Sequence, residues 1–182
     1  MPQERADARR NRARILAAAE AVFAERGPAA STEEIAARAG VAVGTVFRHF
    51  PTKRDLLVAI LKDLRDGLMR TAAALAEDPG DGLFRFLAHV VEEAAAKRTV
   101  VALLADAGTG TGTAEPVRAL RGTVDDLLAR AQRAGRVRSD VGTDEVLALL
   151  TAACQGALQA GWDADLRRRT LGVILDGLRA RG

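Results

Sequence analysis

The residues best suited to chemistry lie in a short stretch near the N-terminus, and the chemistry they offer is contact with nucleic acid. Gly44 would let the backbone approach DNA closely, the Thr45 hydroxyl can hydrogen-bond a phosphate or a base, and Arg48 can reach a guanine edge or a phosphate. Lys53, at the start of a following helix, can clamp a phosphate with its charge and the free amides beside it. This pattern predicts a surface that grips DNA.

Such a surface requires a short helix, over roughly residues 43 to 50, that shows one face to DNA and keeps the other in a core. Its large apolar residues are expected only on the inner side, at Val41, Val46 and Phe50. The residues left to face outward are Val43, Gly44, Thr45, Phe47 and Arg48.

The same inspection gives no support for catalysis. The chain holds two histidines and one cysteine, Cys154, and no paired motif that resembles a metal or nucleophile site. Residues 108 to 113 alternate glycine with threonine, yet they follow a helix instead of a strand and lack the Gly-Lys-Ser/Thr ending of a phosphate-binding loop. A flexible connector is favoured there, with a phosphate cradle as the alternative. We therefore expect that the protein is not an enzyme and that it binds neither a cofactor nor a metal ion.

The elements that position the DNA-contacting residues are three helices within about fifty residues. The first spans residues 7 to 26 and stops at the Gly-Pro pair that follows. Ser31 and Glu34 form a capping box that starts a second helix at Thr32, and Gly40 can take the left-handed conformation that ends it. Pro51 closes the third helix, and the next residue, threonine, caps a fourth.

The rest of the chain predicts a larger helical body. The expected helices span residues 53 to 77, 83 to 107 (one or two helices, kinked near residues 97 and 98), 116 to 134, 143 to 160 with Thr143 as its cap, and 163 to 181 with Asp163 as its cap. The fold class is therefore all-α, with about nine helices. Residues 1 to 52 are expected to form a helix-turn-helix domain, and residues 53 to 182 a second, larger helical domain, because the fourth helix is long enough to join the two.

Composition agrees with a helical fold. Hydrophobic residues make up 48% of the 182 residues, aromatic residues only 3%, and tyrosine is absent. Alanine, leucine and valine must then build the core, a mixture that favours packed helices over sheets. No run approaches the roughly 20 uninterrupted apolar residues of a membrane helix, and the N-terminus lacks the pattern of a secretory signal. We expect a cytoplasmic protein with no membrane partner.

Positive charge is concentrated near the N-terminus. Residues 1 to 62 contain 11 lysines and arginines against 7 acidic residues, and the remainder contains 16 against 17. A basic run at the start consists of Arg5, Arg9, Arg10, Arg12 and Arg14. The run suits contact with phosphates. A solvated, frayed terminus is the alternative, because arginine outnumbers lysine 24 to 3 over the whole chain.

Residues 31 to 57 have the sequence STEEIAARAGVAVGTVFRHFPTKRDLL, which closely resembles the DNA-binding signature of the TetR family. The resemblance covers residues 7 to 57. It rests on the pair Gly44-Thr45, the pair His49-Phe50 and the lysine that follows, Lys53. It implies that His49 donates to a phosphate, with a half-buried helix-end histidine as the alternative, and that Ser31 and Thr32 contribute to phosphate binding. Phe47 departs from the family's usual tyrosine and lacks the hydroxyl that bonds a phosphate, and Glu33 stands where relatives present basic or neutral contacts.

The resemblance further implies a homodimer on double-stranded palindromic operator DNA, with recognition helices about 34 Å apart. A small apolar effector would bind among helices four to eight and lower the affinity for DNA. Candidate pocket residues are Leu64, Leu68, Phe84, Leu87, Val90, Leu104, Leu120, Val124 and Cys154. Candidate dimer residues, from the widely apolar last two helices, are Leu147, Leu150, Leu158, Leu166, Leu171 and Ile174. The alternatives are a monomer that buries these residues itself, and an interaction protein that has lost DNA binding.

Overall fold

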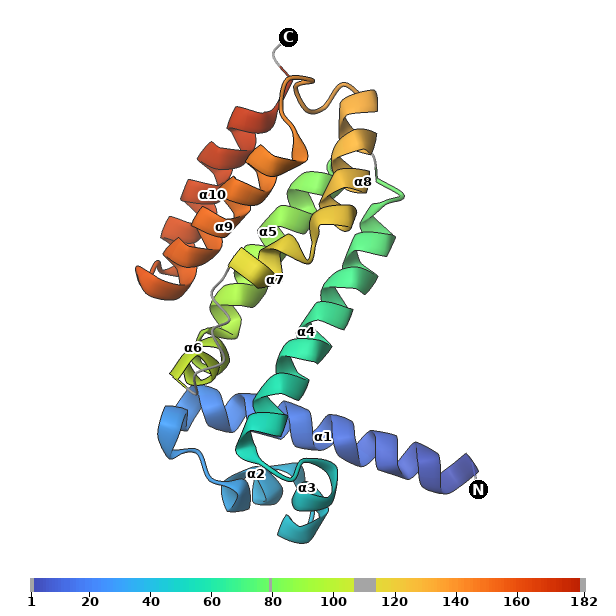
Figure 1. Ribbon diagram of the computed structural model, residues 1–182, viewed down its shortest axis with the longest axis vertical. Coiled ribbons are helices and arrows are strands. Elements are labelled where there is room, and N and C mark those ends of the chain that lie inside the picture. Colours follow the sequence, from blue (N-terminus) through green and yellow to red (C-terminus); the bar gives the residue numbers. More distant parts are fainter. Residues whose placement is uncertain (1, 79, 107–113, 181–182) are drawn as a thin grey trace. The chain divides into compact units, whose positions relative to one another are not determined.

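The computed structural model describes residues 2–78, 80–106 and 114–180, and over these residues the fold is helical (Figure 1). The helices are α1 (Pro2–Arg26), η1 (a 3-10 turn, Gly27–Ala29), α2 (Thr32–Ala39), α3 (Val43–His49), α4 (Lys53–Leu75), α5 (Gly82–Ala96), α6 (Arg98–Asp106), α7 (Ala114–Arg118), α8 (Arg121–Arg133), α9 (Thr143–Gln159) and α10 (Ala164–Leu178). Extended pairing in the described ranges amounts to an isolated bridge between Val137 and Arg179. The predicted all-α class is confirmed, whereas the predicted connector at residues 108 to 113 lies outside the described residues.

Contacts divide the chain into two compact units. The N-terminal unit comprises Met1–Leu64 and Lys97–Gly110, and the C-terminal unit comprises Arg65–Ala96 and Thr111–Gly182. The N-terminal unit thus holds, besides the predicted residues 1 to 52, the first half of α4 and the helix α6, because α6 packs against α1 and η1. None of the helices in the described ranges is long and apolar enough to cross a membrane.

Local capping explains the boundaries of the two short helices. The Ser31 hydroxyl accepts a hydrogen bond from the Glu34 amide at 3.1 Å, and the Glu34 carboxylate accepts one from the Ser31 amide at 3.2 Å, which completes the predicted capping box of α2. Gly40 ends α2 with φ of 64°, the left-handed conformation predicted for it. A reciprocal pair of bonds between Thr52 and Asp55 starts α4 in the same way.

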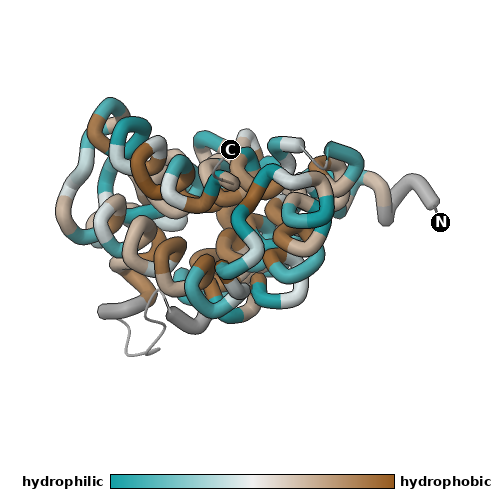
Figure 2. The backbone as a smooth tube through the Cα atoms, turned by 90° about the horizontal axis from the view of Figure 1, so that it is seen from above, coloured by the Kyte–Doolittle hydropathy of each residue, from teal (hydrophilic) through white to brown (hydrophobic). Residues whose placement is uncertain are grey.

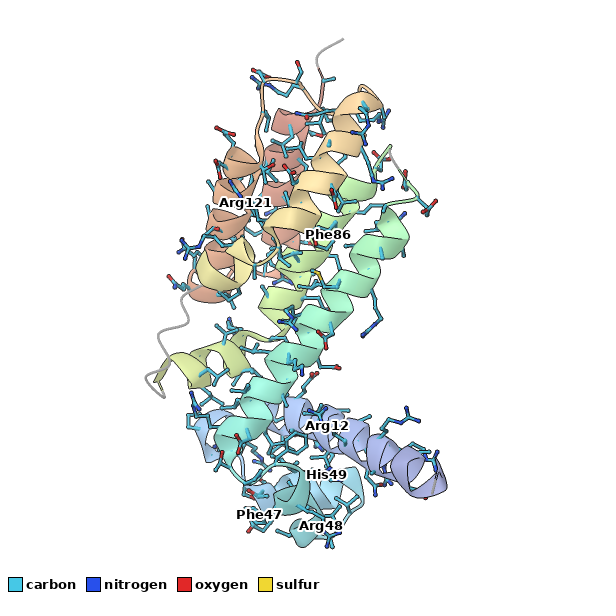
Figure 3. All side chains as sticks on the ribbon, turned by 45° about the vertical axis from the view of Figure 1, so that its right-hand side comes forward. Arg12, Phe47, Arg48, His49, Phe86 and Arg121 are labelled. Carbon is cyan, nitrogen blue, oxygen red and sulfur yellow. The ribbon has the colours of Figure 1, made fainter. Side chains whose placement is uncertain are left out.

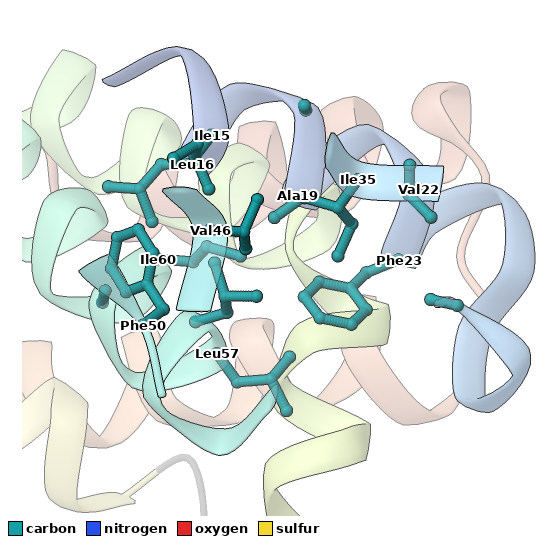
Figure 4. Close-up of a cluster of buried hydrophobic side chains, with 14 of the residues drawn as sticks. Ile15, Leu16, Ala19, Val22, Phe23, Ile35, Val46, Phe50, Leu57 and Ile60 are labelled. Carbon is teal, nitrogen blue, oxygen red and sulfur yellow. The ribbon is translucent and has the colours of Figure 1, made fainter. Parts of the chain in front are cut away.

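The N-terminal unit is built around one hydrophobic cluster to which α1, α2, α3, α4 and α6 all contribute (Figure 4). Its fully buried large side chains include Ile15, Phe23, Ile35, Val46 and Ile60. Val46 is the one residue of α3 that is buried, so it anchors this helix to the rest of the unit. No charged or polar residue is buried in the described part of the chain, and the apolar and polar stretches alternate along the helices (Figure 2).

The C-terminal unit is a set of packed helices in which α9 contacts α5, α7, α8 and α10. Figure 1 shows α9 and α10 lying side by side (orange and red). Trp162, in the turn between them, seats its indole against Gly156, where a Cβ atom would lie only 2.3 Å from the ring. Arg167 of α10 holds this turn through a hydrogen bond to the Trp162 carbonyl at 2.9 Å and a salt bridge to Glu92 of α5 at 2.8 Å.

Three predicted boundaries in this unit differ from the structure. The helix expected from Pro116 is two helices, α7 and α8, separated by a turn. Thr143 is the first helical residue of α9, and the cap is Gly142, whose amide donates a hydrogen bond to the Glu145 carboxylate. The Thr143 hydroxyl instead donates to Asp125 of α8 at 2.6 Å. The last helix ends at Leu178, since Arg179 turns extended and pairs with the segment before α9. The predicted Asp163 cap is confirmed by its bond from the amide of Leu166 at 2.8 Å.

Replacing Gly40 with alanine is expected to destabilise the protein by about 1–2 kcal/mol, because a Cβ atom makes the left-handed conformation sterically unfavourable. A Cβ atom at this position would also meet the end of the Arg14 side chain at 2.6 Å, which must move aside. Chemical denaturation followed by circular dichroism measures the loss.

Gly67→Ala is the matched control, since Gly67 lies inside α4 with an ordinary 3.7 Å contact to Arg70. It should gain up to about 1 kcal/mol from better helix propensity. Equal effects at the two positions would contradict this account of Gly40.

Candidate nucleic-acid interface

The outer face of α3 carries the exposed residues of the candidate interface. Gly44, Phe47 and Arg48 are exposed, whereas Thr45 and His49 are half-buried. Phe47 leaves 47% of its surface accessible, which is unusual for so large an apolar side chain. Figure 3 shows Phe47 and Arg48 together on the outer side of α3. An exposed aromatic ring beside an exposed guanidinium suits both the apolar and the hydrogen-bonding groups of a DNA groove.

Val43 differs from its expected outward orientation. It is half-buried and packs against the hydrophobic cluster of the N-terminal unit, because it lies in the first turn of α3, one turn before the buried Val46. Its methyl groups therefore contribute to anchoring the helix. The exposed part of the outer face of α3 therefore centres on Gly44, Phe47 and Arg48.

The start of α2 offers a second set of polar groups. Ser31 and Thr32 are both half-buried, and the Ser31 hydroxyl already accepts the capping bond from Glu34. A hydroxyl that accepts one bond still has its own hydrogen to donate, so the cap does not prevent a phosphate contact. Glu33 is exposed next to them and would oppose a phosphate by charge.

Lys53 is placed differently from the phosphate clamp that the sequence predicted. Its ammonium group donates hydrogen bonds to the carbonyl oxygens of Pro28 at 2.7 Å and Ala30 at 3.1 Å. It also lies 5.5 Å from the centre of the Phe23 ring. The positive charge is therefore directed at the link between α1 and α2. Sequence reasoning missed this contact because its acceptors are backbone carbonyls 23 and 25 residues away.

Two arginines of the basic run contact residues at the C-terminal ends of α2 and α3. The Arg14 guanidinium donates to the carbonyl of Gly40 at the end of α2, at 3.3 Å, and the Arg12 guanidinium lies 5.1 Å from the centre of the Phe50 ring, just beyond α3. Cations at these positions also complement the negative ends of the helix dipoles. His49 lies beside Phe50 with ring centres 6.2 Å apart.

A further ion pair joins α1 directly to α2. The Arg38 guanidinium donates two hydrogen bonds to the Glu25 carboxylate, at 2.6 and 2.9 Å. These bonds lower the pKa of Glu25 and raise the pKa of Arg38. Both side chains are largely solvated, so the pair positions α2 more than it stabilises the fold.

The predicted pocket residues fall into two groups. Seven are buried in the C-terminal unit, and these are Leu68, Phe84, Leu87, Val90, Leu120, Val124 and Cys154. Leu104 instead belongs to the hydrophobic cluster of the N-terminal unit, where α6 packs on α1, and Leu64 is half-buried at the last residue of that unit's α4 segment. A void of about 10 Å³ lies among α5, α9 and α10, and an open depression of about 480 Å³ lies beside Arg121 and Asp144.

The predicted dimer residues are likewise divided. Leu147, Leu150 and Leu171 are buried in the core of the C-terminal unit itself, Leu158 and Ile174 are half-buried, and Leu166 is exposed. Two exposed apolar residues on the same helices, Leu149 and Val173, were not predicted. Their hydrophobicity was visible in the sequence, but which side of each helix faces the core was not.

Groups that could hold a metal ion are lacking among the described residues. Every buried side-chain nitrogen and oxygen described has a hydrogen-bond partner. Cys154 is buried in α9, and burial raises the pKa of its thiol to about 12. The Cys154 thiol is therefore not an activated nucleophile. Of the surfaces described above, the outer face of α3 is the site that the geometry favours.

Two short helices around a glycine turn, the second with an exposed basic and aromatic face, define a DNA-binding protein of the helix-turn-helix class. Comparison with known proteins agrees. Residues 15–60 match the profile of bacterial regulatory proteins of the tetR family, and residues 78–180 match the C-terminal domain of SbtR-like transcriptional regulators. The chain belongs to the TetR family of transcriptional regulators, which confirms the resemblance found in the sequence.

Individual relatives are similar over different lengths. The HTH-type transcriptional repressor Rv3405c of Mycobacterium tuberculosis is 50% identical over 76 residues, 41% of this chain and 39% of that protein, so the match spans well under half of the relative's length. The HTH-type transcriptional regulator TtgR of Pseudomonas putida is 32% identical over 96% of this chain and 81% of its own. The crystal structure of a TetR regulator from Mycobacterium vanbaalenii superposes with a TM-score of 0.78 at 42% identity, covering 97% of this chain and 99% of that one.

Gly44→Ala separates stability from DNA contact. A Cβ atom at Gly44 would meet nothing within 4 Å in the free protein, so alanine should stabilise α3 by up to about 1 kcal/mol. The same methyl group would stand between the α3 backbone and DNA and should weaken operator binding about tenfold. Thermal unfolding and fluorescence anisotropy on labelled DNA measure the two effects.

Gly122→Ala is the control, because Gly122 is also the second residue of its helix and is equally open. It should gain similar stability and leave DNA binding unchanged. If the Gly44 variant binds the operator as tightly as the wild type, the α3 backbone does not approach DNA closely at this position.

Cys154 should resist alkylation by iodoacetamide at pH 8 in the folded protein and react rapidly in denaturant. Its pKa is raised from 9.0 to about 12 by folding, so its contribution to stability is complete below pH 9 and is lost as the pH rises from 9 towards 12. Mass spectrometry of timed samples measures the reaction. Fast labelling of the native protein would show that the thiol is exposed.

Proposed function

We propose that the protein is a one-component transcriptional repressor that binds a palindromic operator as a homodimer and is released by a small-molecule effector. The observation that carries this proposal is the exposed face of α3, where Phe47 and Arg48 project from a helix anchored through Val46. Repression, in particular, is supported by the similarity to Rv3405c of Mycobacterium tuberculosis, which is a transcriptional repressor. No enzymatic role is proposed, and with DNA as its partner we infer that the protein acts in the cytoplasm.

The proposed DNA contacts follow from exposure and chemistry. Arg48 would bond a guanine edge or a phosphate, and Phe47 would pack on a thymine methyl group or a sugar. Gly44 would let the backbone of α3 approach the DNA closely. Thr45 would hydrogen-bond a phosphate or a base. Ser31 and Thr32, at the start of α2, and His49, at the end of α3, would donate to phosphates on either side, and together these contacts fix the register of the helix on the duplex.

The proposed dimer contact uses the exposed side of α9 and α10. Leu149, Leu166 and Val173 are exposed there, and Val173 leaves 75% of its surface in solvent. Exposed apolar residues on two adjacent helices suit a contact that a second copy would cover by symmetry. A dimer would place two recognition helices on one operator.

The proposed effector binds in the C-terminal unit. The seven predicted pocket residues buried there are apolar or a neutral thiol, so a small, largely apolar molecule suits them. Because α4 starts in the N-terminal unit and ends in the C-terminal unit, an effector that shifts α4 would change the affinity for DNA. Loss of operator binding on addition of candidate apolar compounds tests this part.

Arg48→Ala should weaken operator binding roughly 5- to 150-fold, since one good contact to a base contributes about 1–3 kcal/mol. The measurement is binding of the purified protein to DNA from upstream of its own gene, and then to sites chosen by genome-wide selection, at several salt concentrations. The wild-type affinity should fall steeply with salt.

The control for this experiment is Arg133→Ala, which removes an exposed arginine from the end of α8 in the C-terminal unit and should change nothing. Equal losses in the two variants would indicate an unspecific effect of net charge. If the wild type prefers no DNA over random sequence, the repressor proposal fails, and the exposed Phe47 and Glu33 would then favour a protein partner.

Val173→Glu should convert the dimer to monomer, because it places a charge in the proposed apolar contact. Sedimentation velocity measures the change in mass. Val58→Glu, at a 47% exposed position of α4 in the N-terminal unit, is the control and should leave the dimer intact. A variant at position 173 that still sediments as a dimer would place the contact elsewhere.

A further inference from the structure

We propose that Lys53 is a positioning residue that fixes the helix-turn-helix in its DNA-binding geometry, and that its ammonium group is not a phosphate contact. The inference rests on the proposed function, because it assigns how the same surface is held in shape. It also reassigns the residue whose charge and location in the sequence most suggested a phosphate clamp.

The first support is the direction of the ammonium group. Two of its three N–H groups donate to the carbonyls of Pro28 and Ala30, at 2.7 and 3.1 Å, and the charge faces the Phe23 ring. Lys53 is half-buried, unlike the exposed Arg48 on the outer face of α3. Reaching a phosphate would require breaking both bonds and leaving two carbonyl acceptors without this partner.

The second support is what these bonds join. The acceptors lie in η1 and just after it, in the short link through which α1 passes into α2. Lys53 is the first residue of α4, separated from the end of α3 by three residues. The ammonium group therefore ties the entrance of α2 to the exit of α3. This contact fixes the distance between the two helices that must meet DNA together.

The third support is the conformation and length of the connected link. Gly27 opens η1 in the left-handed region, with φ of 55°, and only two residues separate the end of η1 from the start of α2. A link this short transmits any displacement directly to α2. Removal of the tie should allow α2 and α3 to sample several arrangements, which weakens recognition of one particular sequence more than general attraction to DNA.

Lys53→Met tests the assignment, because methionine keeps an unbranched side chain, one atom shorter than that of lysine, and removes the charge. We expect operator affinity to fall about tenfold, the ratio of operator to random-DNA affinity to fall with it, and the slope of log affinity against log salt to stay the same. A phosphate contact would instead weaken binding to both DNAs equally and reduce the slope by about 0.9 for each Lys53 in the complex. A lower melting temperature with unchanged DNA affinity would indicate a merely structural role. Either of the last two results overturns the proposal.

A measurement on the unmodified protein covers the case in which the variant fails to fold. The chain has three lysines, Lys53, Lys62 and Lys97, so reductive methylation can be followed at each by peptide mass spectrometry. Lys62 is exposed and serves as the fast internal reference. We expect Lys53 to react several times more slowly than Lys62 in the protein without DNA.

Equal rates for Lys53 and Lys62 in the free protein would refute the assignment, since a phosphate clamp must be accessible before DNA binds. This measurement needs no operator. A wild-type protein that binds no specific DNA would therefore refute the proposed function while the contacts of Lys53 remained testable by themselves.

Discussion

The candidate interface depends on one constraint, which is that its two helices are too short to exist alone. α2 has eight residues and α3 has seven, whereas isolated helices below about 12 residues are marginal in water. Both are stable because Ile35 and Val46 enter the cluster formed with α1, α4 and α6. The outer face of α3 can then be devoted to recognition, because its inner side alone supplies the packing.

The sequence predicted those features whose causes are local. The start of α2 is determined by Ser31 and Glu34, three residues apart, and its end by Gly40, so a window of ten residues contains the whole explanation. Asp163 starts α10 for the same reason. The helical class was predictable as well, because apolar residues recur at helical spacing throughout, and Pro51 placed the end of the recognition helix within one residue of its observed position.

The features that escaped prediction arise from contacts distant in the sequence. Lys53 faces carbonyls more than twenty residues away, and the Thr143 hydroxyl bonds Asp125 of another helix instead of capping its own. Leu104 is apolar, as a residue of an effector pocket would be. It is nevertheless enclosed in the core of the N-terminal unit, because α6 packs on α1. A helical pattern shows that a face is apolar, but only the tertiary arrangement determines which neighbour covers it.

The seating of Trp162 against Gly156 has an optical consequence. The chain contains one tryptophan and no tyrosine, so its intrinsic fluorescence arises almost entirely from the turn between α9 and α10. The emission therefore reports on the C-terminal unit, whereas far-ultraviolet circular dichroism reports on the helices of both units. Unfolding curves from the two signals distinguish a molecule that melts in one cooperative step from one whose units melt separately. The protein thus carries a built-in probe for one half of its structure, and no label is needed to use it.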